Sequence, residues 1–488
     1  MSPGGFEARE AGRLRASTTG AERIVVVGAG MAAVRLAELL GSSASQAPMA
    51  SREADDPGIT LLGDEPHPPY NRILLSAVLE GTHSPDALTM RTPDHTELRL
   101  GTRVVEIHRE EREVELADRS RVPYDRLVLA TGSIPTLPPI RGLVRVDGRL
   151  HEKVHAFRTL ADCQRLDAAI STGSINEGAR NAVVVGGGLL GLQVARALSI
   201  RGVATEVVEG GEHLLRSQVG ARAGAVLARD LERLGTTVYT GARAVRLDDR
   251  GLTLDNGYTL DTDLVVLTAG GRPSTALARR AGLDVRRGIV VDQHLRTSDD
   301  RIHAIGDCAQ HGGQVTGFVP PAWEQAALLA RHLSGEDVSY DGARTVARLR
   351  ATDLDVAVLG EPEKAEGQVV EVSNPVTGSH RKLVVRGGVI VAATLVGDLS
   401  RIGLITQHYD RGTVLGPREP GDLLMGERPA GPVVLPDDAE VCACAGVSAG
   451  RIRACSSYED VRTSTRATTG CGGCTAAVRE LVTEGALT

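Results

Sequence analysis

The sequence contains few residues of several kinds, and each scarcity excludes a class of protein. Only three of the 55 basic residues are lysines, and the net charge of −7 argues against a nucleic-acid or membrane-surface role, which needs a concentrated basic face. No run of about 18 apolar residues occurs, so no membrane span is predicted. Residues 1–22 lack the apolar core of a signal peptide and are expected to form a disordered tail. These features predict a cytoplasmic protein, in which thiols stay reduced.

Cysteine is also scarce, with seven in 488 residues and none in the first 160, yet four lie close together near the end of the chain. They occur as "VCACAG" and "TGCGGC", a C-x-C and a C-x-x-C pair. Four soft thiolates suit either zinc or an iron–sulfur cluster, and spacing alone does not separate the two. The predicted metal ligands are Cys442, Cys444, Cys471 and Cys474. The intervening Cys455 is predicted not to be a ligand.

An internal repeat indicates two dinucleotide-binding units. "IVVVGAGMAAVRLAELL" from Ile24 and "AVVVGGGLLGLQVARAL" from Ala182 each combine a β-branched run, a glycine turn and apolar residues at helical spacing. In such a turn the first glycine permits the bend and the second lets the backbone approach a pyrophosphate. The third position must be small so that helix and strand can pack.

Each repeat is followed by a second strand that ends in an acidic residue. "ITLLGDE" ends at Glu65 and "TEVVEG" places Glu209, where a carboxylate can accept the hydroxyl groups of an adenosine ribose. A small, polar insertion over 41–58 explains the longer spacing in the first repeat. Two glycine turns with matching acids are stronger evidence than a single glycine motif.

The C-terminal third divides into three predicted segments. Residues 339–415 alternate apolar and polar side chains and are expected to form a sheet. Residues 416–436 are rich in proline and glycine and predict a linker. Residues 437–488 form a domain too small for a sufficient core, which suggests that a metal holds it together.

Three further strings, "YDRLVLATGSIP", "DLVVLTAGGRP" and "IHAIGDCAQ", complete a resemblance over about residues 22–415. The chain resembles the flavoproteins with two dinucleotide-binding domains, the class I pyridine nucleotide–disulfide oxidoreductase fold. This implies an α/β fold with two Rossmann-like domains, an α+β interface domain at 339–415 and a small helical domain at 437–488. The FAD-binding domain would cover 23–156 and 273–338, and the NADH-binding domain 157–272.

The resemblance also implies the residues that bind each dinucleotide. FAD would contact Gly28, Gly30, Met31, Ala32, Glu65, Arg72, Thr131, Gly132, Gly306, Asp307, Trp323 and Glu324. NADH would contact Gly186, Gly188, Leu189, Leu190, Glu209, Arg216 and Gly270. No side chain is expected to act as an acid or a base, because the flavin itself takes the hydride.

The string "EPHPPYNRILLS" is similar to the flavin domain of NADH-dependent nitrite reductase large subunits, in which an arginine placed like Arg72 lies against FAD. The alternative for Arg72 is a surface ion pair. "PPAWEQAALLARHL" would be the helix whose N-terminus, by its dipole and free N–H groups, stabilises negative charge on the flavin. The alternative for Trp323 in this helix is a core position.

The end of the chain resembles the bacterioferritin-associated-ferredoxin type of [2Fe–2S] domain, although the stretch between its cysteine pairs is shorter than expected. Disulfide reductases of the flavoprotein fold need a cysteine pair beside the flavin. Here Cys163 and Cys308 have no partner at short spacing and are predicted to be small core residues. The flavin is therefore expected to pass its electrons to the cluster.

The resemblances together imply an NADH-oxidising subunit that passes electrons through FAD and a [2Fe–2S] cluster to a separate reductase. The electron-transfer subunits of assimilatory nitrate reductases, which serve a molybdenum subunit, fit best, because 14 residues after Cys474 leave no room for a sirohaem domain. The alternatives are a reductase for a sirohaem nitrite reductase or a ferredoxin-dependent oxygenase, and a redox or NAD(H) sensor. Zinc remains the alternative metal.

Overall fold

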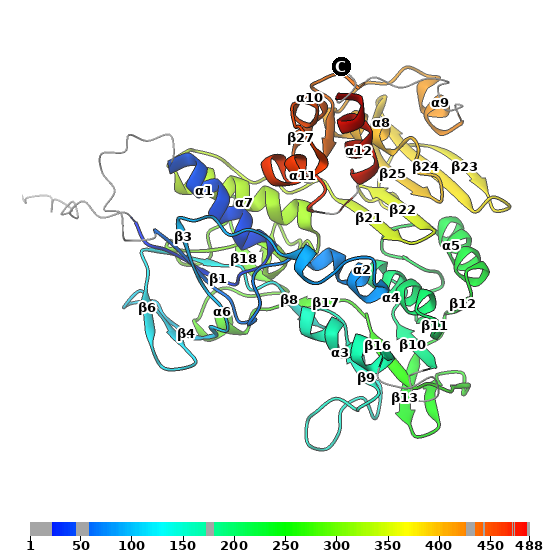
Figure 1. The fold of residues 1–488 in the computed structure, drawn as a ribbon, viewed down its shortest axis with the longest axis horizontal. Helices are drawn as coiled ribbons and strands as arrows, with labels where there is room; N and C mark the ends of the chain where they lie inside the picture. Colours follow the sequence, from blue (N-terminus) through cyan, green and yellow to red (C-terminus); the bar gives the residue numbers. More distant parts are fainter. Residues whose placement is uncertain are drawn as a thin grey trace, which may run out of the picture.

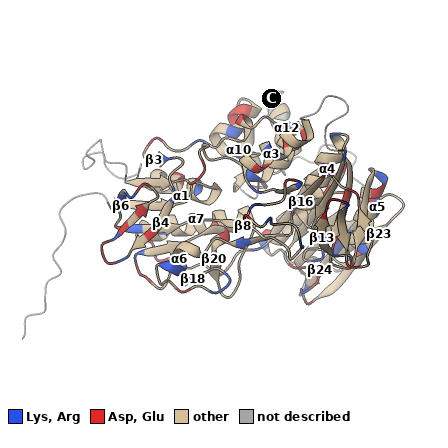
Figure 2. Ribbon diagram, turned by 90° about the horizontal axis from the view of Figure 1, so that it is seen from below, with Lys and Arg blue, Asp and Glu red and all other residues tan. Residues whose placement is uncertain are grey.

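The computed structural model describes residues 22–44, 58–171, 180–425, 435–442, 445–470, 472 and 474–485. Two units built on parallel sheets are followed by an antiparallel sheet, and a small helical domain at the C-terminal end of the chain lies against the first unit and the antiparallel sheet (Figure 1). Basic and acidic residues are interspersed along the ribbon (Figure 2). None of the helices in the described ranges combines the length and apolarity needed to cross a bilayer.

The first unit is built on a sheet of five parallel strands. In sheet order these are β19 (Ile302–Ala304), β7 (Arg126–Leu129), β1 (Ile24–Val27), β2 (Ile59–Leu62) and β3 (Thr96–Arg99). The strands β1, β2 and β7 are runs of valine, isoleucine and leucine, because both faces of a parallel sheet are covered. Helices α1 (Met31–Ala44) and α7 (Val319–Leu333) pack against each other beside this sheet.

Smaller elements complete the first unit. They are the antiparallel strands β4 (Val104–His108), β5 (Glu113–Leu116) and β6 (Arg121–Pro123), the pair β18 (Ile289–Val291) and β20 (Ala309–His311), and helix α6 (Ala276–Arg280). Helix α2 (Leu75–Glu80) instead packs on α3 (Leu160–Ser171) and α4 (Leu189–Ile200) of the second unit, in whose core Leu75 and Leu79 are buried. The predicted insertion at 41–58 begins with the last turn of α1, and residues 45–57 lie outside the described ranges.

The second unit repeats this architecture. Its parallel sheet has the order β12 (Thr236–Thr240), β11 (Ala204–Glu209), β10 (Asn181–Val185), β16 (Leu264–Leu267) and β9 (Val154–Ala156). Its other elements are helices α3 (Leu160–Ser171), α4 (Leu189–Ile200) and α5 (Ala221–Arg233) and the antiparallel strands β13 (Ala244–Asp248), β14 (Gly251–Leu254) and β15 (Thr259–Leu260).

The predicted boundary between the two units is wrong by one strand. β9 pairs in parallel with β16, from Val154 beside Val265 to Ala156 beside Leu267, so residues 154–156 belong to the second unit. An edge strand of three residues carries no period in the sequence that would reveal its partner. The chain passes between the units along β8 (Ser133–Pro135) and β17 (Gly271–Pro273), which form an antiparallel pair.

The third unit is the expected sheet. Its antiparallel order is β21 (Val346–Ala351), β22 (Leu354–Leu359), β25 (Val389–Val396), β24 (Ser379–Arg386) and β23 (Gln368–Asn374). Helix α8 (Ile402–Arg411) packs on β25, and α9 (Glu419–Met425) packs on β23 and β24. The predicted linker at 416–436 is therefore wrong over 419–425, since Leu423 and Leu424 are buried in this unit's core. Residues 426–434 lie outside the described ranges.

The last domain consists of short elements whose apolar side chains join the core of the first unit. They are β26 (Glu440–Cys442), β27 (Val447–Ser448), α10 (Ala449–Arg453), α11 (Tyr458–Asp460), a π-helical turn at Val461–Thr465 and α12 (Thr475–Gly485). Val447, Ile452, Val461 and Val478 are fully buried in one cluster with residues of α1 and α7. The domain is thus docked on the first unit.

The core of the first unit contains a histidine that predicts loss of stability in acid. His303, on β19, is fully buried, and neither ring nitrogen has a hydrogen-bond partner among the described residues. Burial, and then the nearby Arg126 and His332, lowers the pKa of His303 to about 3. The unfolded chain takes up this proton near pH 6.5 and the folded chain does not. The contribution of neutral His303 to the free energy of unfolding is therefore fully present above pH 6.5 and is lost as the pH falls below it.

Between about pH 6.5 and pH 3, we expect His303 to lower the free energy of unfolding by about 1.4 kcal/mol for each unit that the pH falls. His303→Leu should flatten this slope, because leucine binds no proton. The free energy of unfolding is measured at each pH by urea unfolding, followed by the fluorescence of Trp323. This residue is the one tryptophan of the sequence and lies in the core of the first unit. An equal acid slope in the variant would contradict the assignment.

Candidate functional site

The two predicted glycine turns lie at the carboxyl ends of the central strands of the two parallel sheets. Gly28 and Gly186 have φ of +112° and +118°, and a Cβ on either would meet a backbone oxygen of the neighbouring strand end, Ala130 at 2.3 Å or Thr268 at 2.7 Å. A Cβ at Gly30 or Gly188 would meet nothing within 4 Å. The first position therefore requires glycine for the fold, whereas the second leaves open space for a ligand.

A cavity of about 960 Å³ opens at the first turn. Most residues predicted to bind FAD line it: Gly28, Gly30, Met31, Ala32, Glu65, Arg72, Thr131, Gly132, Gly306, Asp307 and Glu324. They come from the β1–α1 turn, the end of β2, the 3₁₀ turn at Arg72–Leu74, the end of β7, the turn after β19 and the start of α7. Ligands bind in this position, beyond the carboxyl ends of the strands, in open α/β sheets generally.

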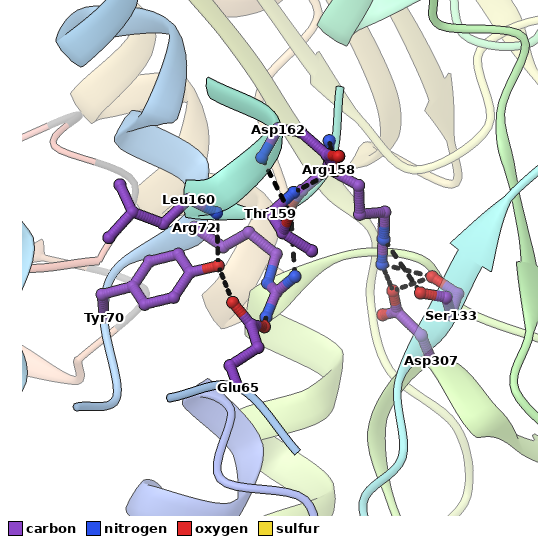
Figure 3. A network of polar contacts seen from close by, with 9 residues as sticks. All are labelled: Glu65, Tyr70, Arg72, Ser133, Arg158, Thr159, Leu160, Asp162 and Asp307. Atoms are coloured by element: carbon purple, nitrogen blue, oxygen red, sulfur yellow. Dashed lines mark hydrogen bonds and ion pairs between the residues drawn. The ribbon is translucent and has the colours of Figure 1, made fainter. Parts of the chain in front are cut away.

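Glu65 is the centre of a polar network on one wall of the cavity (Figure 3). Its carboxylate accepts hydrogen bonds from Arg72 Nη2 at 2.6 Å and from the Tyr70 hydroxyl at 2.7 Å. The Tyr70 oxygen in turn accepts from the backbone N–H of Leu160 at 2.9 Å. Arg72 thus forms an ion pair, the alternative considered from the sequence, and also lines the cavity.

Charge and burial fix the protonation of this network. Burial, with the nearby Glu65, raises the pKa of Tyr70, so its hydroxyl keeps the proton that it donates. Burial acts to lower the pKa of Arg72, but the charge and hydrogen bond of the Glu65 carboxylate act against it, and the pKa is raised. Arg72 is therefore a permanent cation in the cavity wall.

A second network holds Asp307, and it includes an arginine that sequence reasoning missed. Asp307 Oδ2 accepts from Ser133 Oγ at 2.8 Å and from Arg158 Nη2 at 2.7 Å, and Arg158 Nε donates to the Ser133 carbonyl at 3.0 Å (Figure 3). The backbone carbonyl of Arg158 accepts from Arg72 Nη1 at 3.1 Å, which joins the two networks. Arg158 lies between β9 and α3, outside every glycine motif, so no sequence signal indicated it.

Trp323 does not line the cavity, in contrast to the prediction that it binds FAD. Its side chain is buried between α1 and α7, where Nε1 donates to the Met31 carbonyl at 3.2 Å. The guanidinium groups of Arg35 and Arg466 lie 5.9 and 5.6 Å from its ring centre. Helical periodicity turns Trp323 towards α1, whereas its neighbours Ala322 and Glu324 line the cavity.

The start of α7 faces the cavity with fewer donors than predicted. Val319, Pro320 and Ala322 line the cavity wall. Of the first three helical residues only Val319 has an N–H group, because the next two are prolines. The helix dipole still directs its positive end here.

The second glycine turn positions the residues predicted to bind NADH. The Glu209 carboxylate accepts from the N–H groups of Gly187 at 2.8 Å and Gly211 at 2.6 Å, which fixes it at the end of β11. Arg216 Nε lies 3.7 Å from the same carboxylate. Leu189 and Leu190, at the start of α4, reach the wall of the first cavity, whereas Gly186, Gly188, Glu209, Arg216 and Gly270 do not.

The cysteines fall into two groups. Cys163 and Cys308 are fully buried, and burial raises the pKa of both, to about 12 for Cys163, so neither is a reactive thiolate. Cys442 and Cys474 are buried but line the same cavity as the first glycine turn. Cys474 Sγ accepts from the Thr468 N–H at 3.2 Å. Cys444 and Cys471 lie outside the described residues.

Cys455 differs from both groups. Its thiol donates to the Arg451 carbonyl at 3.3 Å, lies 3.4 Å from Ser464 Oγ, and is not part of the cavity wall.

Three carboxyl groups surround the part of the cavity near Cys442. Glu324, Asp410 and Glu440 line it together with Arg344. All three side chains are exposed, yet partial desolvation raises the pKa of each, and the charge of Asp410 raises those of Glu324 and Glu440 further.

Two nucleotide-binding folds, joined by short strands around one cavity, define a class of flavoprotein that binds two dinucleotides. The family model described as pyridine nucleotide-disulphide oxidoreductase matches residues 22–326, and the chain belongs to this family. The model described as BFD-like [2Fe-2S] binding domain matches residues 440–484. These matches confirm the predicted family, the fold class and the cofactor types, FAD, NAD and [2Fe–2S].

Two relatives from Bacillus subtilis (strain 168) match over nearly the whole chain. The nitrite reductase [NAD(P)H] is 34% identical over 485 residues, which cover 95% of this chain and 58% of the relative. The assimilatory nitrate reductase electron transfer subunit is 31% identical over 488 residues, which cover 94% of this chain and 59% of the relative. The chain thus spans somewhat more than half the length of these relatives.

Solved structures agree with the fold. The putidaredoxin reductase–putidaredoxin complex matches with a TM-score of 0.71 and 26% identity, covering 82% of this chain and 96% of that one. The NADH:rubredoxin oxidoreductase of Clostridium acetobutylicum matches with a TM-score of 0.64 and 20% identity, covering 80% of this chain and 96% of that one. At that identity the second match shows the fold alone.

Proposed function

We propose that this chain oxidises NADH and delivers single electrons to a separate catalytic reductase, an assimilatory molybdenum nitrate reductase. The observation that carries the proposal is one continuous cavity, whose wall includes the first glycine turn and Asp307 as well as Cys442 and Cys474. Bound FAD would take a hydride from NADH and give up its two electrons singly through the [2Fe–2S] cluster, so that NADH becomes NAD⁺ and the partner is reduced.

The residues present fit FAD. The open space at Gly30 and the N-terminus of α1 suit a pyrophosphate, and the Glu65 carboxylate suits ribose hydroxyl groups. Arg72 supplies a fixed cation and Asp307 a fixed hydrogen-bond acceptor. The positive end of the α7 dipole would favour negative charge on the reduced flavin.

The residues present also fit a cluster. Two buried thiols and a backbone N–H directed at one of them suit soft-metal binding. These features support electron transfer between a flavin and a cluster held in the same cavity.

NADH should be preferred to NADPH, because the Glu209 carboxylate is fixed by two backbone N–H groups where a 2′-phosphate would lie. At about 4 Å and an effective dielectric of about 20 the repulsion is roughly 4 kcal/mol before screening. A preference of about tenfold or more in kcat/KM is expected. Glu209→Ala should reduce the preference for NADH over NADPH, and Arg216→Ala should not. Equal use of both nucleotides by the unchanged protein would contradict the role given to Glu209.

The acceptor is proposed from the relatives and is tested by reconstitution. The purified chain should reduce neither nitrate nor nitrite, and should support NADH-dependent nitrate reduction when a molybdenum nitrate reductase subunit is added. The nitrite reductase relatives favour a second candidate, so a sirohaem nitrite reductase is the parallel arm. Nitrate reduction by the chain alone, or a deletion strain that grows normally on nitrate, would overturn the assignment. Rapid NADH-dependent reduction of ferricyanide distinguishes an enzyme from a sensor.

A further inference from the structure

The side chain of Asn71, in the first unit, forms hydrogen bonds with backbone groups, and two of these groups belong to the small C-terminal domain. It is 3% exposed, and its amide nitrogen donates to the carbonyls of Thr469 and of Gly470, the latter at 2.6 Å. Its oxygen accepts from the Ile73 N–H at 3.1 Å. Because Gly470 directly precedes Cys471, one side chain of the flavin-binding unit holds the backbone next to a predicted cluster ligand.

Arg466 makes a second connection between the same two parts of the molecule. Its guanidinium forms an ion pair with Glu38 of α1 and lies 5.6 Å from the ring centre of Trp323 of α7. Burial, and then the nearby Arg35, lowers the pKa of Arg466 to about 10. A largely buried arginine is unfavourable unless its partners compensate, so these contacts explain why it is held here.

The segment between these two contacts also reaches a cluster thiol. The Thr468 N–H donates to Cys474 Sγ at 3.2 Å. Arg466 and Thr468 have φ of +64° and +70°, a region that residues other than glycine rarely adopt. Such a backbone persists only when its surroundings hold it. The flavin-binding unit provides that hold, through Asn71 at Thr469 and Gly470 and through Glu38 and Trp323 at Arg466.

We propose that these contacts form a docking seam, consisting of Glu38, Asn71 and Trp323 on one side and Arg466, Thr469 and Gly470 on the other. The seam positions the 466–470 segment, and hence the cluster thiols, at the flavin cavity. Asn71 and Arg466 are positioning residues in this scheme. The inference rests on the proposed function for its kinetic consequence, whereas docking itself is independent of any bound group.

The sharpest variant is Asn71→Asp. An aspartate keeps the oxygen that accepts from Ile73 N–H, and so preserves the turn that carries Arg72, but it replaces the donor nitrogen with an oxygen facing two carbonyls. Arg466→Ala breaks the seam at its other end. Arg462→Ala is the matched control, because Arg462 lies in the neighbouring π-helical turn and pairs with Glu459 of the same domain at 3.3 Å.

Amide hydrogen exchange of full-length protein tests docking, with and without cofactors. Peptides covering 466–470 should exchange at least about tenfold faster in Asn71→Asp and Arg466→Ala than in the unchanged protein, because buried carbonyls lose their donors or an ion pair is broken. Arg462→Ala should exchange like the unchanged protein. Unchanged exchange in both seam variants would overturn the seam, even if the chain holds no cluster.

Stopped-flow absorbance tests positioning on the loaded protein. The rate of NADH-driven cluster reduction, divided by the rate of flavin reduction, should fall at least about tenfold in the seam variants and not in Arg462→Ala. Faster exchange with an unchanged ratio would reduce the seam to a structural contact and overturn its positioning role. A cluster that NADH does not reduce even in the unchanged protein would instead contradict the proposed function.

Discussion

Cys442→Ser is expected to abolish electron delivery to the partner reductase while flavin reduction by NADH continues near its normal rate. A serine hydroxyl is a poor substitute for a thiolate ligand of iron. Loss of a mere hydrogen-bond partner of a metal ligand costs about 10–100-fold in metal affinity, so the loss of a ligand should cost more. Flavin bleaching after mixing with NADH, compared with partner-dependent nitrate reduction, measures the two steps separately.

Cys163→Ser is the matched control for this prediction. Cys163 is buried on α3, and its thiol donates to the Leu75 carbonyl at 3.5 Å, a bond that a serine hydroxyl can replace. Both rates should therefore remain near normal. If Cys163→Ser destroyed NADH turnover, the assignment of this thiol to the core would be wrong.

Gly30→Ala is expected to separate folding from flavin binding. An added Cβ at Gly30 meets nothing within 4 Å, so stability should change by no more than about 0.5 kcal/mol. The same Cβ would occupy the space into which a pyrophosphate must come close to the backbone. FAD affinity should consequently fall by about tenfold or more, which corresponds to about 1.4 kcal/mol. Titration of the flavin-free protein with FAD measures this directly.

Gly28→Ala is the contrasting variant. Its Cβ would lie 2.3 Å from the Ala130 carbonyl oxygen at a φ of +112°. Overpacking and backbone strain together should cost about 3 kcal/mol or more. This variant should lose both stability and flavin, whereas Gly30→Ala should lose flavin alone. Equal flavin affinity in Gly30→Ala and the unchanged protein would show that the pyrophosphate does not approach this turn.

The parts of the molecule that the sequence predicted well are those specified by local pattern. The turns at Gly28 and Gly186 have a backbone geometry that only glycine accommodates, so the glycines mark them in the sequence, and the acidic strand ends follow from alternation and spacing. The cysteine pairs are equally local. These features located the dinucleotide-binding folds and the cluster domain, and the family matches agree.

The features that the sequence did not predict depend on tertiary contacts. Trp323 faces α1 because of how α7 is rotated, and the short helix α9 forms because Leu423 and Leu424 find an apolar surface on β23 and β24. Arg158 bonds to Asp307, which lies more than 100 residues further along the chain. Asn71 bonds to Gly470, which lies more than 300 residues further along. No periodicity within a segment carries such information.

The most direct test of the account is an anaerobic NADH titration of the purified chain, monitored by absorbance and by electron paramagnetic resonance, after iron and sulfide analysis. The account predicts about two iron and two sulfide per chain, and a rhombic signal from the reduced cluster that grows as NADH is added. Stoichiometric zinc without sulfide, or a cluster that dithionite reduces and NADH does not, would contradict it.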